Sequence, residues 1–193
     1  KVKTALKPQY VDKLPLVSKG VVKDLLSKVA ERMTVDEAAD LLELNEVINR
    51  PLDKLSGGEL QRVAIAASIM KEADTYFFDE PSSYLDIYQR IKVARIIQDL
   101  SETKQVIVIE HDLAILDFLA DSAYLVYGSE GAYGVFAQPR QVRTAINTYL
   151  DGYMREENIR FRDTQIRFES HPPRDSQMTA KLLEYGALEC DYK

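Results

Sequence analysis

The stretch Leu55–Arg62, which reads LSGGELQR, carries the clearest local signal in this chain. Ser56 and Glu59 have the spacing of a capping box, so a helix is expected to begin here and to bury the apolar residues that follow. A helix start offers free backbone amides and a partial positive charge, and two glycines let an anion approach closely. The stretch therefore indicates a phosphate-binding helix start, or an ordinary helix start after a flexible turn.

A hydrophobic segment that ends in two acids follows at Thr75–Pro81, which reads TYFFDEP. An aspartate at the carboxyl end of a strand can hold Mg²⁺, which prefers hard oxygen ligands, so Asp79 is a candidate metal ligand. The adjacent Glu80 can polarise a water for attack on a γ-phosphate. The alternative is a pair of surface acids that simply end a strand.

Two further polar groups follow in order. Asp86 comes soon after the acidic pair, and His111 follows a second apolar run at Val106–Ile109. A histidine at the carboxyl edge of a sheet can reach the same phosphate, although a lone histidine there is more often structural. The order of Gln9, the Ser56 turn, the acidic pair, Asp86 and His111 favours a common nucleotide site.

Working outward, the chain after Pro51 alternates between helical and strand patterns. Thr75–Phe78 and Val106–Ile109 are short continuous apolar runs, typical of strands buried on both faces of a parallel sheet. A helix with apolar residues at helical spacing between Ile87 and Ile97 separates them, and a helix at Leu113–Ala120 and a strand at Ala123–Tyr127 follow. This alternation predicts an α/β layered domain.

The first 50 residues have a different pattern. A strand at Val2–Leu6 leads into a loop in which Pro8 removes a backbone donor. One helix is expected from about Lys19 to Met33, and a second begins at Thr34, where Glu37 completes a capping-box spacing. These residues predict a small helical subdomain.

Composition excludes several classes of protein. The 193 residues carry a net charge of −6, which argues against a protein that coats nucleic acid through general electrostatics. No apolar stretch approaches the roughly 20 residues that a membrane span needs, and no secretion signal is recognisable. The single Cys190 excludes an internal disulfide framework and a multi-cysteine metal site, so a reducing cytoplasmic location is expected. Neither end resembles a natural terminus, and we interpret the sequence as a fragment.

Together the motifs resemble those of the ATP-binding-cassette (ABC) ATPases. Gln9 matches the Q-loop, Leu55–Gln61 the signature, Phe77–Glu80 the Walker B strand, Ser82–Asp86 the D-loop, and His111 the switch histidine. The resemblance implies a P-loop NTPase-like fold in which two such domains sandwich two nucleotides. The signature residues then bind the nucleotide held by the opposite domain.

The roles of the site residues are implied by the same resemblance. Asp79 and Gln9 contact Mg²⁺, Glu80 is the general base, and His111 contacts the γ-phosphate of ATP. The residues expected to contact the nucleotide are Gln9, Leu55, Ser56, Gly57, Gly58, Glu59, Gln61 and Asp86.

The phosphate-binding loop of this family is absent from these 193 residues. No Gly-x-x-x-x-Gly-Lys-[Ser/Thr] pattern occurs, and no glycine lies between Lys1 and Gly20. The chain is thus expected to be a cassette without its N-terminal P-loop part, and to hold ATP poorly or not at all by itself.

Several stretches resemble ABC subfamily E more specifically, the ribosome-recycling ATPases of the RNase L inhibitor family. These stretches are Lys7–Asp12, Glu80–Asp86, Gly131–Val135 and Glu157–Arg162. The expected division is a Q-loop segment at 1–12, the helical subdomain and signature at 13–62, an α/β core at 63–150, a hinge at 151–176 and the start of a second nucleotide-binding domain at 177–193. In this division the core belongs to the first of two cassettes.

The subfamily resemblance also implies partners. These are the small ribosomal subunit with its RNA, a release or rescue factor, and a second cassette of the same protein, with no membrane. The 4Fe–4S clusters of the family are expected only in an N-terminal domain that this sequence lacks. Hinge arginines interleaved with Phe161 and Phe168 can grip RNA or clamp two cassettes, or they can lie on an ordinary solvated strand.

Two other functions compete with ribosome recycling. One is the cassette of a membrane transporter, with a membrane partner docking near Gln9. The other is a partner-binding piece without catalysis, which describes the fragment in isolation. Tyr84, where transporter cassettes more often have alanine or threonine, and the arginine-rich segment after Tyr153 favour ribosome recycling.

Overall fold

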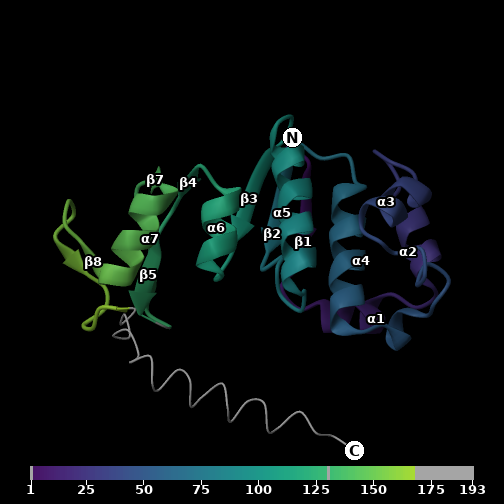
Figure 1. Ribbon diagram of the computed structural model, residues 1–193, viewed down its shortest axis with the longest axis horizontal. Coiled ribbons are helices and arrows are strands. Elements are labelled where there is room, and N and C mark those ends of the chain that lie inside the picture. The colour runs from purple at the N-terminus through teal and green to yellow at the C-terminus, as the bar shows by residue number, and fades with distance from the viewer. Residues whose placement is uncertain (1, 130, 168–193) are drawn as a thin grey trace, which may run out of the picture. The chain divides into compact units, whose positions relative to one another are not determined.

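Three parallel strands lie at the centre of the computed structural model, which describes residues 2–129 and 131–167. They are β1 (Thr4–Lys7), β2 (Thr75–Asp79) and β3 (Gln105–Ile109), in the order β1-β2-β3 (Figure 1). Lys7 pairs with Phe78, and Asp79 pairs with Ile109. Because parallel strands end at the same edge of a sheet, the residues after all three strands meet at that edge. This confirms the parallel strands expected from the apolar runs.

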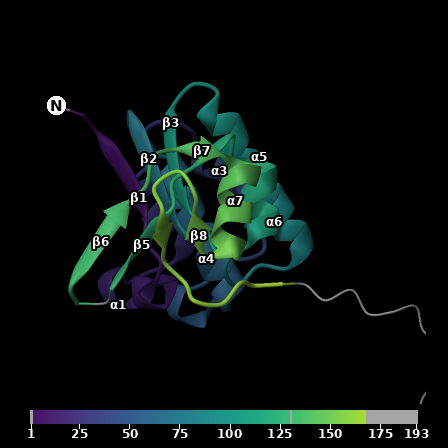
Figure 2. The ribbon, with the colours of Figure 1, turned by 90° about the vertical axis from the view of Figure 1, so that its left-hand side faces the viewer.

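Two helices cover one face of this sheet, α4 (Gly57–Ile69) and α5 (Ile87–Ser101) (Figure 2). Their apolar residues form one buried cluster with Ala5, Tyr76 and Phe78 of the strands. The opposite face stays open to solvent within the described residues. Leu6 is 59% exposed, Ile107 43% and Ile109 53%. The expectation that both apolar strands are buried on both faces is therefore wrong for β3, in which every second residue is exposed.

Helix starts follow the signals in the sequence. Ser56 and Glu59 form a reciprocal capping box at the start of α4, and Thr34 and Glu37 form another at α3 (Val35–Leu41). Asp86 caps α5 by accepting a hydrogen bond from the Gln89 amide. Each side chain satisfies a backbone donor that a helix start leaves without an intrahelical acceptor.

The helical segment before α4 is more broken than expected. It contains η1 (Val11–Lys13), α1 (Leu14–Val17), α2 (Val22–Ser27), α3 and η2 (Leu52–Lys54). The helix predicted from Lys19 to Met33 is limited to α2. Gly20 has a φ of 116°, Val21 pairs with Pro51, and the amides of Glu31 and Arg32 donate to the carbonyl of Met70. Long-range backbone hydrogen bonds thus replace helical ones on both sides of α2.

This segment has no separate core. Val22 and Leu26 of α2, and Ala38 and Ala39 of α3, are buried in the cluster that contains the strand residues. The helical subdomain and the sheet therefore stabilise each other through one continuous apolar interior.

After β3, α6 (Leu113–Leu119) lies close to its predicted position, but the next strand does not. The expected strand Ala123–Tyr127 is divided into β4 (Ser122–Ala123) and β5 (Val126–Ser129). They pair with different partners, β4 with β7 (Arg140–Gln141) and β5 with β6 (Tyr133–Phe136). The apolar pattern of this stretch does not reveal that its two ends join different sheets.

The chain divides into two compact units. The first comprises Lys1–Val126 and Phe136–Ile146, and the second comprises Tyr127–Val135 and the chain from Asn147 onward. The chain passes between the units after Val126, after Val135 and again within α7 (Val142–Asp151). Across residues 2–129 and 131–167, no helix is long and apolar enough to cross a membrane.

The second unit contains the described part of the expected hinge. A hairpin pairs β8 (Tyr153–Met154) with β9 (Ile159–Arg160). The guanidinium of Arg160 lies over the ring of Tyr153, and that of Arg162 lies 4.6 Å from the ring centre of Tyr149. These arginines pack on aromatic rings within their own unit. Phe168, Cys190 and the expected second domain at 177–193 lie outside the described residues.

Candidate active site

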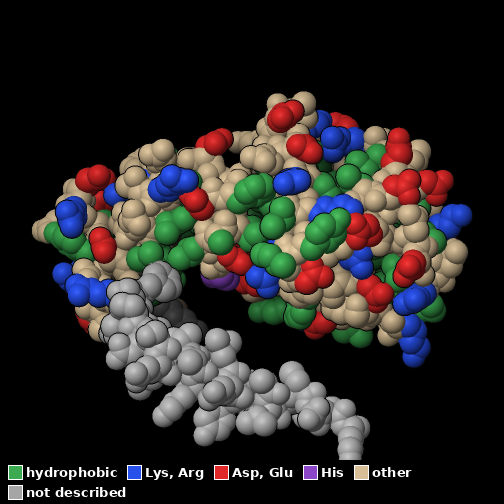
Figure 3. Space-filling model, viewed as in Figure 1, with side chains coloured by type: hydrophobic (Ala, Val, Ile, Leu, Met, Phe, Trp, Pro, Cys, Tyr) green, Lys and Arg blue, Asp and Glu red, His purple; other side chains and the backbone are tan. Residues whose placement is uncertain are grey.

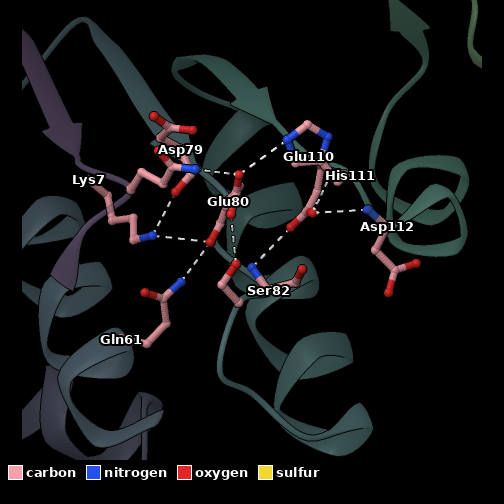
Figure 4. A network of polar contacts seen from close by, with 10 residues as sticks. Lys7, Gln61, Asp79, Glu80, Ser82, Glu110, His111 and Asp112 are labelled. Carbon is pink, nitrogen blue, oxygen red and sulfur yellow. Dashed lines mark hydrogen bonds and ion pairs between the residues drawn. The ribbon is translucent and has the colours of Figure 1, made fainter. Parts of the chain in front are cut away.

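Asp79, Glu80 and His111 come together at the carboxyl edge of the sheet (Figure 4), and a hydrogen bond joins Gln9 to Glu80 there. Asp79 ends β2 and Glu80 follows it, while Gln9 lies two residues after β1 and His111 two residues after β3. This edge is where open α/β sheets bind ligands. The fold therefore brings side chains from three separate segments into one site.

The carboxylate of Glu80 is the centre of this arrangement. Its Oε1 accepts a hydrogen bond of 2.6 Å from Gln9 Nε2 and lies 3.2 Å from His111 Nε2. Its Oε2 accepts a hydrogen bond of 3.0 Å from Ser83 Oγ. The role of Ser83 was missed in the sequence, where only its place in the stretch after the acidic pair could have indicated it. The carboxylate is thus oriented by three different loops.

The backbone beneath Glu80 is held equally firmly. Glu80 has a φ of 47°, in the left-handed region. Lys7 Nζ donates to the carbonyl oxygens of Asp79 and Glu80 at 2.7 and 3.1 Å, and Gln61 Nε2 donates to those of Glu80 and Pro81 at 2.8 and 2.9 Å. Donors from β1 (Lys7) and from α4 (Gln61) therefore hold the backbone around Glu80, the candidate base.

Lys7 has an unusual electrostatic environment for a lysine. Its side chain has no exposed surface. Burial lowers the pKa of its ammonium group to about 8, and the negative charges of Asp79, Glu80 and Glu110 oppose part of that shift. The supporting role of Lys7 was not predicted from the sequence. The available signal was a lysine two residues after Ala5, on the same side of a short apolar strand.

Gln61 lies in a different place from the one expected of a nucleotide ligand. The residue has no exposed surface, and its amide nitrogen is engaged with the backbone after β2. A side chain enclosed in this way supports the loop of Glu80 from within the protein, so the structure argues against its direct contact with a nucleotide.

The loop after β3 is tied to the loop after β2. Glu110 Oε1 accepts from the Ser82 amide at 3.0 Å, and Oε2 accepts from the His111 and Asp112 amides at 2.9 and 3.3 Å. Arg90 of α5 pairs with Asp112 at 2.9 Å. These bonds fix the backbone of His111, whereas its side chain is 79% exposed.

The signature turn is open to solvent at its glycines. Gly57 is exposed, and the amides of the first helical turn have no intrahelical acceptor, so they point outward from the helix start. A Cβ on Gly57 would lie 3.0 Å from Tyr84 Cδ1, and one on Gly58 would lie 3.0 Å from the Tyr84 carbonyl oxygen. Glycine is needed at position 58 because the Tyr84 backbone lies against the turn, whereas at position 57 the contact is with the movable Tyr84 ring. The sequence did not suggest this explanation.

The other expected nucleotide ligands have structural roles in this chain. Leu55 packs against the apolar cluster, and Asp86 caps α5. Glu59 accepts hydrogen bonds from the amide and hydroxyl of Ser56, and the bond from the Ser56 backbone amide is the main reason that the pKa of Glu59 is lowered. Of the signature residues, Ser56 and Gly57 are exposed at the start of the helix, and Gly58 beside them is half-buried.

A magnesium ion would find few protein ligands at this site. Within the residues that the structure describes, no group of three or more His, Cys, Asp or Glu side chains is placed to hold a metal ion. The Asp79 carboxylate has no hydrogen-bond partner among them, and Gln9 uses its amide nitrogen on Glu80, so its oxygen is the atom that can ligate. Mg²⁺ commonly takes one or two protein ligands together with substrate phosphates and water, so this donor set fits it.

Comparison with known proteins identifies relatives over most of the chain. Residues 3–83 match the family model described as "ABC transporter". The chain is 49% identical over 168 residues to the ABC transporter E family member 1 of Arabidopsis thaliana, covering 86% of this chain and 28% of that protein. The matched residues 3–83 include the turn at Ser56 and the segment that ends in Asp79 and Glu80.

Solved structures give the same result. A complex of an archaeal ribosomal stalk protein with the archaeal ribosome recycling factor aABCE1 matches with a TM-score of 0.83 and 50% identity over 91% of this chain and 34% of that one. A model of ribosome-bound archaeal Pelota and ABCE1 matches with a TM-score of 0.83 and 53% identity over 90% of this chain and 30% of that one. The chain thus spans about a third of the length of these relatives.

Proposed function

Because this chain belongs to subfamily E of the ABC proteins, we propose that it is the later part of a nucleotide-binding domain in a twin-cassette ATPase that splits ribosomes into subunits. The observation that carries the proposal is the carboxylate of Glu80, bonded to Gln9 and 3.2 Å from His111 at the carboxyl edge of a parallel sheet. We assign the chain to the first cassette and the beginning of the hinge.

In this proposal Glu80 is the general base of ATP hydrolysis. Its carboxylate would accept the proton of the attacking water, and the hydrogen bonds from Gln9 and Ser83 orient it for that task. Asp79 and Gln9 would hold the magnesium ion, which neutralises developing charge on the phosphates when it is bound. The exposed imidazole of His111 would contact the γ-phosphate.

The P-loop would come from a part of the parent protein outside this sequence. The open face of the sheet, with Leu6, Ile107 and Ile109 exposed, supports this proposal. An α/β sheet of parallel strands is normally covered on both faces, and the covering layer here would include the missing phosphate-binding part. The chain alone would accordingly be inactive.

The open signature turn would serve a second cassette. Ser56 and the amides of Gly57 and Gly58 lie at the exposed start of α4, where they can bind phosphate oxygens of a nucleotide held by the other domain. ATP binding would then draw the two cassettes together, and this closure would supply the motion that separates ribosomal subunits.

The proposed partners follow from the relatives. Two matching structures contain a ribosomal stalk protein or a ribosome-bound Pelota, so we propose the small ribosomal subunit with its RNA, and a release or rescue factor, as partners of the parent protein in the cytoplasm. The 4Fe–4S clusters would belong to another domain of that parent.

Co-sedimentation of the full-length protein with small ribosomal subunits tests this function. In the presence of a non-hydrolysable ATP analogue, the wild-type protein should pellet with the subunits. Ser56→Arg should fill the phosphate site at the open turn and abolish that nucleotide-dependent pelleting, while the control Thr103→Arg, at an exposed position, should leave it unchanged. Binding to a membrane subunit with no pelleting of the wild type would instead favour a transporter cassette.

A further inference from the structure

A lysine buried at the end of an apolar strand needs an explanation beyond packing. Lys7 faces the side of the sheet that α4 and α5 cover, together with Ala5 of the same strand, and it has no exposed surface. Transfer of an ammonium group from water into a protein interior is costly unless acceptors surround it. An apolar side chain of similar length would fill the same volume without that cost.

The acceptors of Lys7 are specific. They are the backbone carbonyl oxygens of Asp79 and Glu80, 72 and 73 residues away along the chain. Lys7 ends β1 and pairs with Phe78 of β2. Its side chain reaches the carbonyl groups of Asp79, the last residue of β2, and of Glu80, the next residue. The ammonium group therefore contacts the backbone at the junction between β2 and the loop that begins at Glu80 (Figure 4).

That place carries an unfavourable backbone conformation. Glu80 has a φ of 47°, and the left-handed region is disfavoured for residues with a Cβ. Such a conformation persists only when its surroundings determine it. Lys7 supplies one donor to each of two successive carbonyls, and Gln61 supplies donors to the carbonyl of Glu80 and to the next one.

We propose that Lys7 is a positioning residue for Glu80: its ammonium group, with the Gln61 amide opposite, holds the left-handed peptide that aims the Glu80 carboxylate at Gln9 and His111. The proposal rests on the proposed function, in which Glu80 is the base. Lys7 acts through the backbone and does not touch the reacting atoms. Gln9 lies two residues after Lys7. The same segment therefore contacts the backbone around Glu80 through Lys7 and the Glu80 carboxylate through Gln9.

The experiment compares Lys7→Met with Lys7→Gln in the full-length protein. Lys7→Met keeps the volume and removes the donors, so kcat for ATP hydrolysis should fall by about 10-fold to 100-fold, the effect expected of a misplaced catalytic group, with KM close to the wild-type value. Lys7→Gln keeps N–H donors and should recover much of kcat. Lys3→Met, at an exposed position just before β1, is the matched control and should behave like wild type.

A double mutant separates positioning from a general structural effect. In a Glu80→Gln background the base is already absent, so adding Lys7→Met should not lower the residual kcat further. Multiplicative losses, or a Lys7→Met protein with wild-type kcat, would overturn the proposal. If Lys7→Met does not fold, Gln61→Met removes the donors on the other side of the same peptide, where a selective loss of kcat supports the proposal and an unchanged kcat overturns it.

Failure of this inference can be told apart from failure of the proposed function. Glu80→Gln alone should lower kcat by at least about 100-fold if Glu80 is the base, whatever Lys7 does. A Glu80→Gln protein with this loss, together with a fully active Lys7→Met protein, rejects the role of Lys7 and leaves the ATPase assignment intact. A fully active Glu80→Gln protein rejects both.

Discussion

Glu80 combines a left-handed backbone with a carboxylate that receives hydrogen bonds from Gln9 and Ser83. These contacts fix the carboxylate before any ligand arrives, so little reorganisation is needed when a water is activated. The neighbouring Asp79 has a different environment, because its carboxylate has no hydrogen-bond partner among the described residues. The two adjacent acids thus have different environments, which suit the two roles proposed for them, a base for Glu80 and a metal ligand for Asp79.

The charge of Glu80 is expected to matter for turnover and much less for ATP binding. Glu80→Gln in the full-length protein should keep the hydrogen bond from Gln9 but lose the proton acceptor, and kcat should fall by roughly 100-fold to 10,000-fold. Steady-state phosphate release measures kcat, and a nucleotide-binding assay on the same variant should give near wild-type affinity. Unchanged phosphate release would remove Glu80 from the role of base.

The lowered pKa of Lys7 predicts a pH dependence of stability. Burial lowers this pKa from 10.5 to about 8, so between these values the unfolded chain binds a proton that the folded chain has released. Stability therefore rises with pH across this window and is lost as the pH falls through about 8. The thermal midpoint of the wild type should rise relative to that of Lys7→Met from pH 8 to pH 10.5. A constant difference between the two midpoints would contradict the assignment.

At the scale of elements, the start of α4 packs against the loop before α5. Tyr84, in the left-handed region at a φ of 64°, lies against both signature glycines, and its side chain is 63% exposed. The two glycines meet different parts of the same residue. Gly57 faces the ring, which can swing into solvent, whereas Gly58 faces the backbone carbonyl, which cannot move without the loop.

This difference predicts unequal costs for two similar substitutions. Gly57→Ala should be nearly neutral, since the Tyr84 ring can give way to the new Cβ. Gly58→Ala should destabilise the protein by about 1–2 kcal/mol, because the new Cβ crowds a fixed carbonyl. Thermal denaturation of both full-length variants provides the comparison, with Gly57→Ala/Tyr84→Ala as a control for the ring. An equal loss for the two single variants would show that Tyr84 does not restrict the turn as described.

At the scale of the whole molecule, the sheet is covered on one face and open on the other. Leu6 of β1 and Ile107 of β3 flank Phe77 of β2 in the register, and Ile109 lies two residues beyond Ile107. Leu6, Ile107 and Ile109 are all exposed. Exposed apolar residues gathered on one face often mark an interaction site, and in the function proposed above the rest of the parent protein would cover this face. On the helix side, Lys, Arg, Asp and Glu side chains are interspersed over the surface (Figure 3).

Ile107→Lys should therefore have opposite effects in two settings. In the isolated chain the charge should reduce self-association through the open face, which sedimentation velocity measures. In the full-length protein, where we expect the face to be covered, the same change should lower the thermal midpoint because it buries an unpaired charge. Thr103→Lys, at an exposed position before the same strand, should do neither. A full-length Ile107→Lys protein as stable as wild type would mean that the face stays open.

Local signals in the sequence determined much of this protein. Capping boxes at Ser56 and Thr34, an apolar run ending in Asp79 and Glu80, and a second run ending before His111 are all short-range patterns, and the structure contains the corresponding helices and strands. The parallel arrangement followed from them, and so did the meeting of the acids and the histidine at one edge. These features depend on residues close together in the chain, whose preferences survive in any fold that uses the same elements.

Only the tertiary structure decided how the site is supported. The bonds of Lys7 and Gln9 to the Glu80 loop join residues more than 70 positions apart, and Gln61 reaches the same loop from another element. Such contacts depend on strand register and helix packing, which no local pattern encodes. The exposure of one face of the sheet also could not be predicted from the sequence. An apolar strand has the same composition whether one of its faces is covered or both, so exposure depends on which layers pack against the sheet.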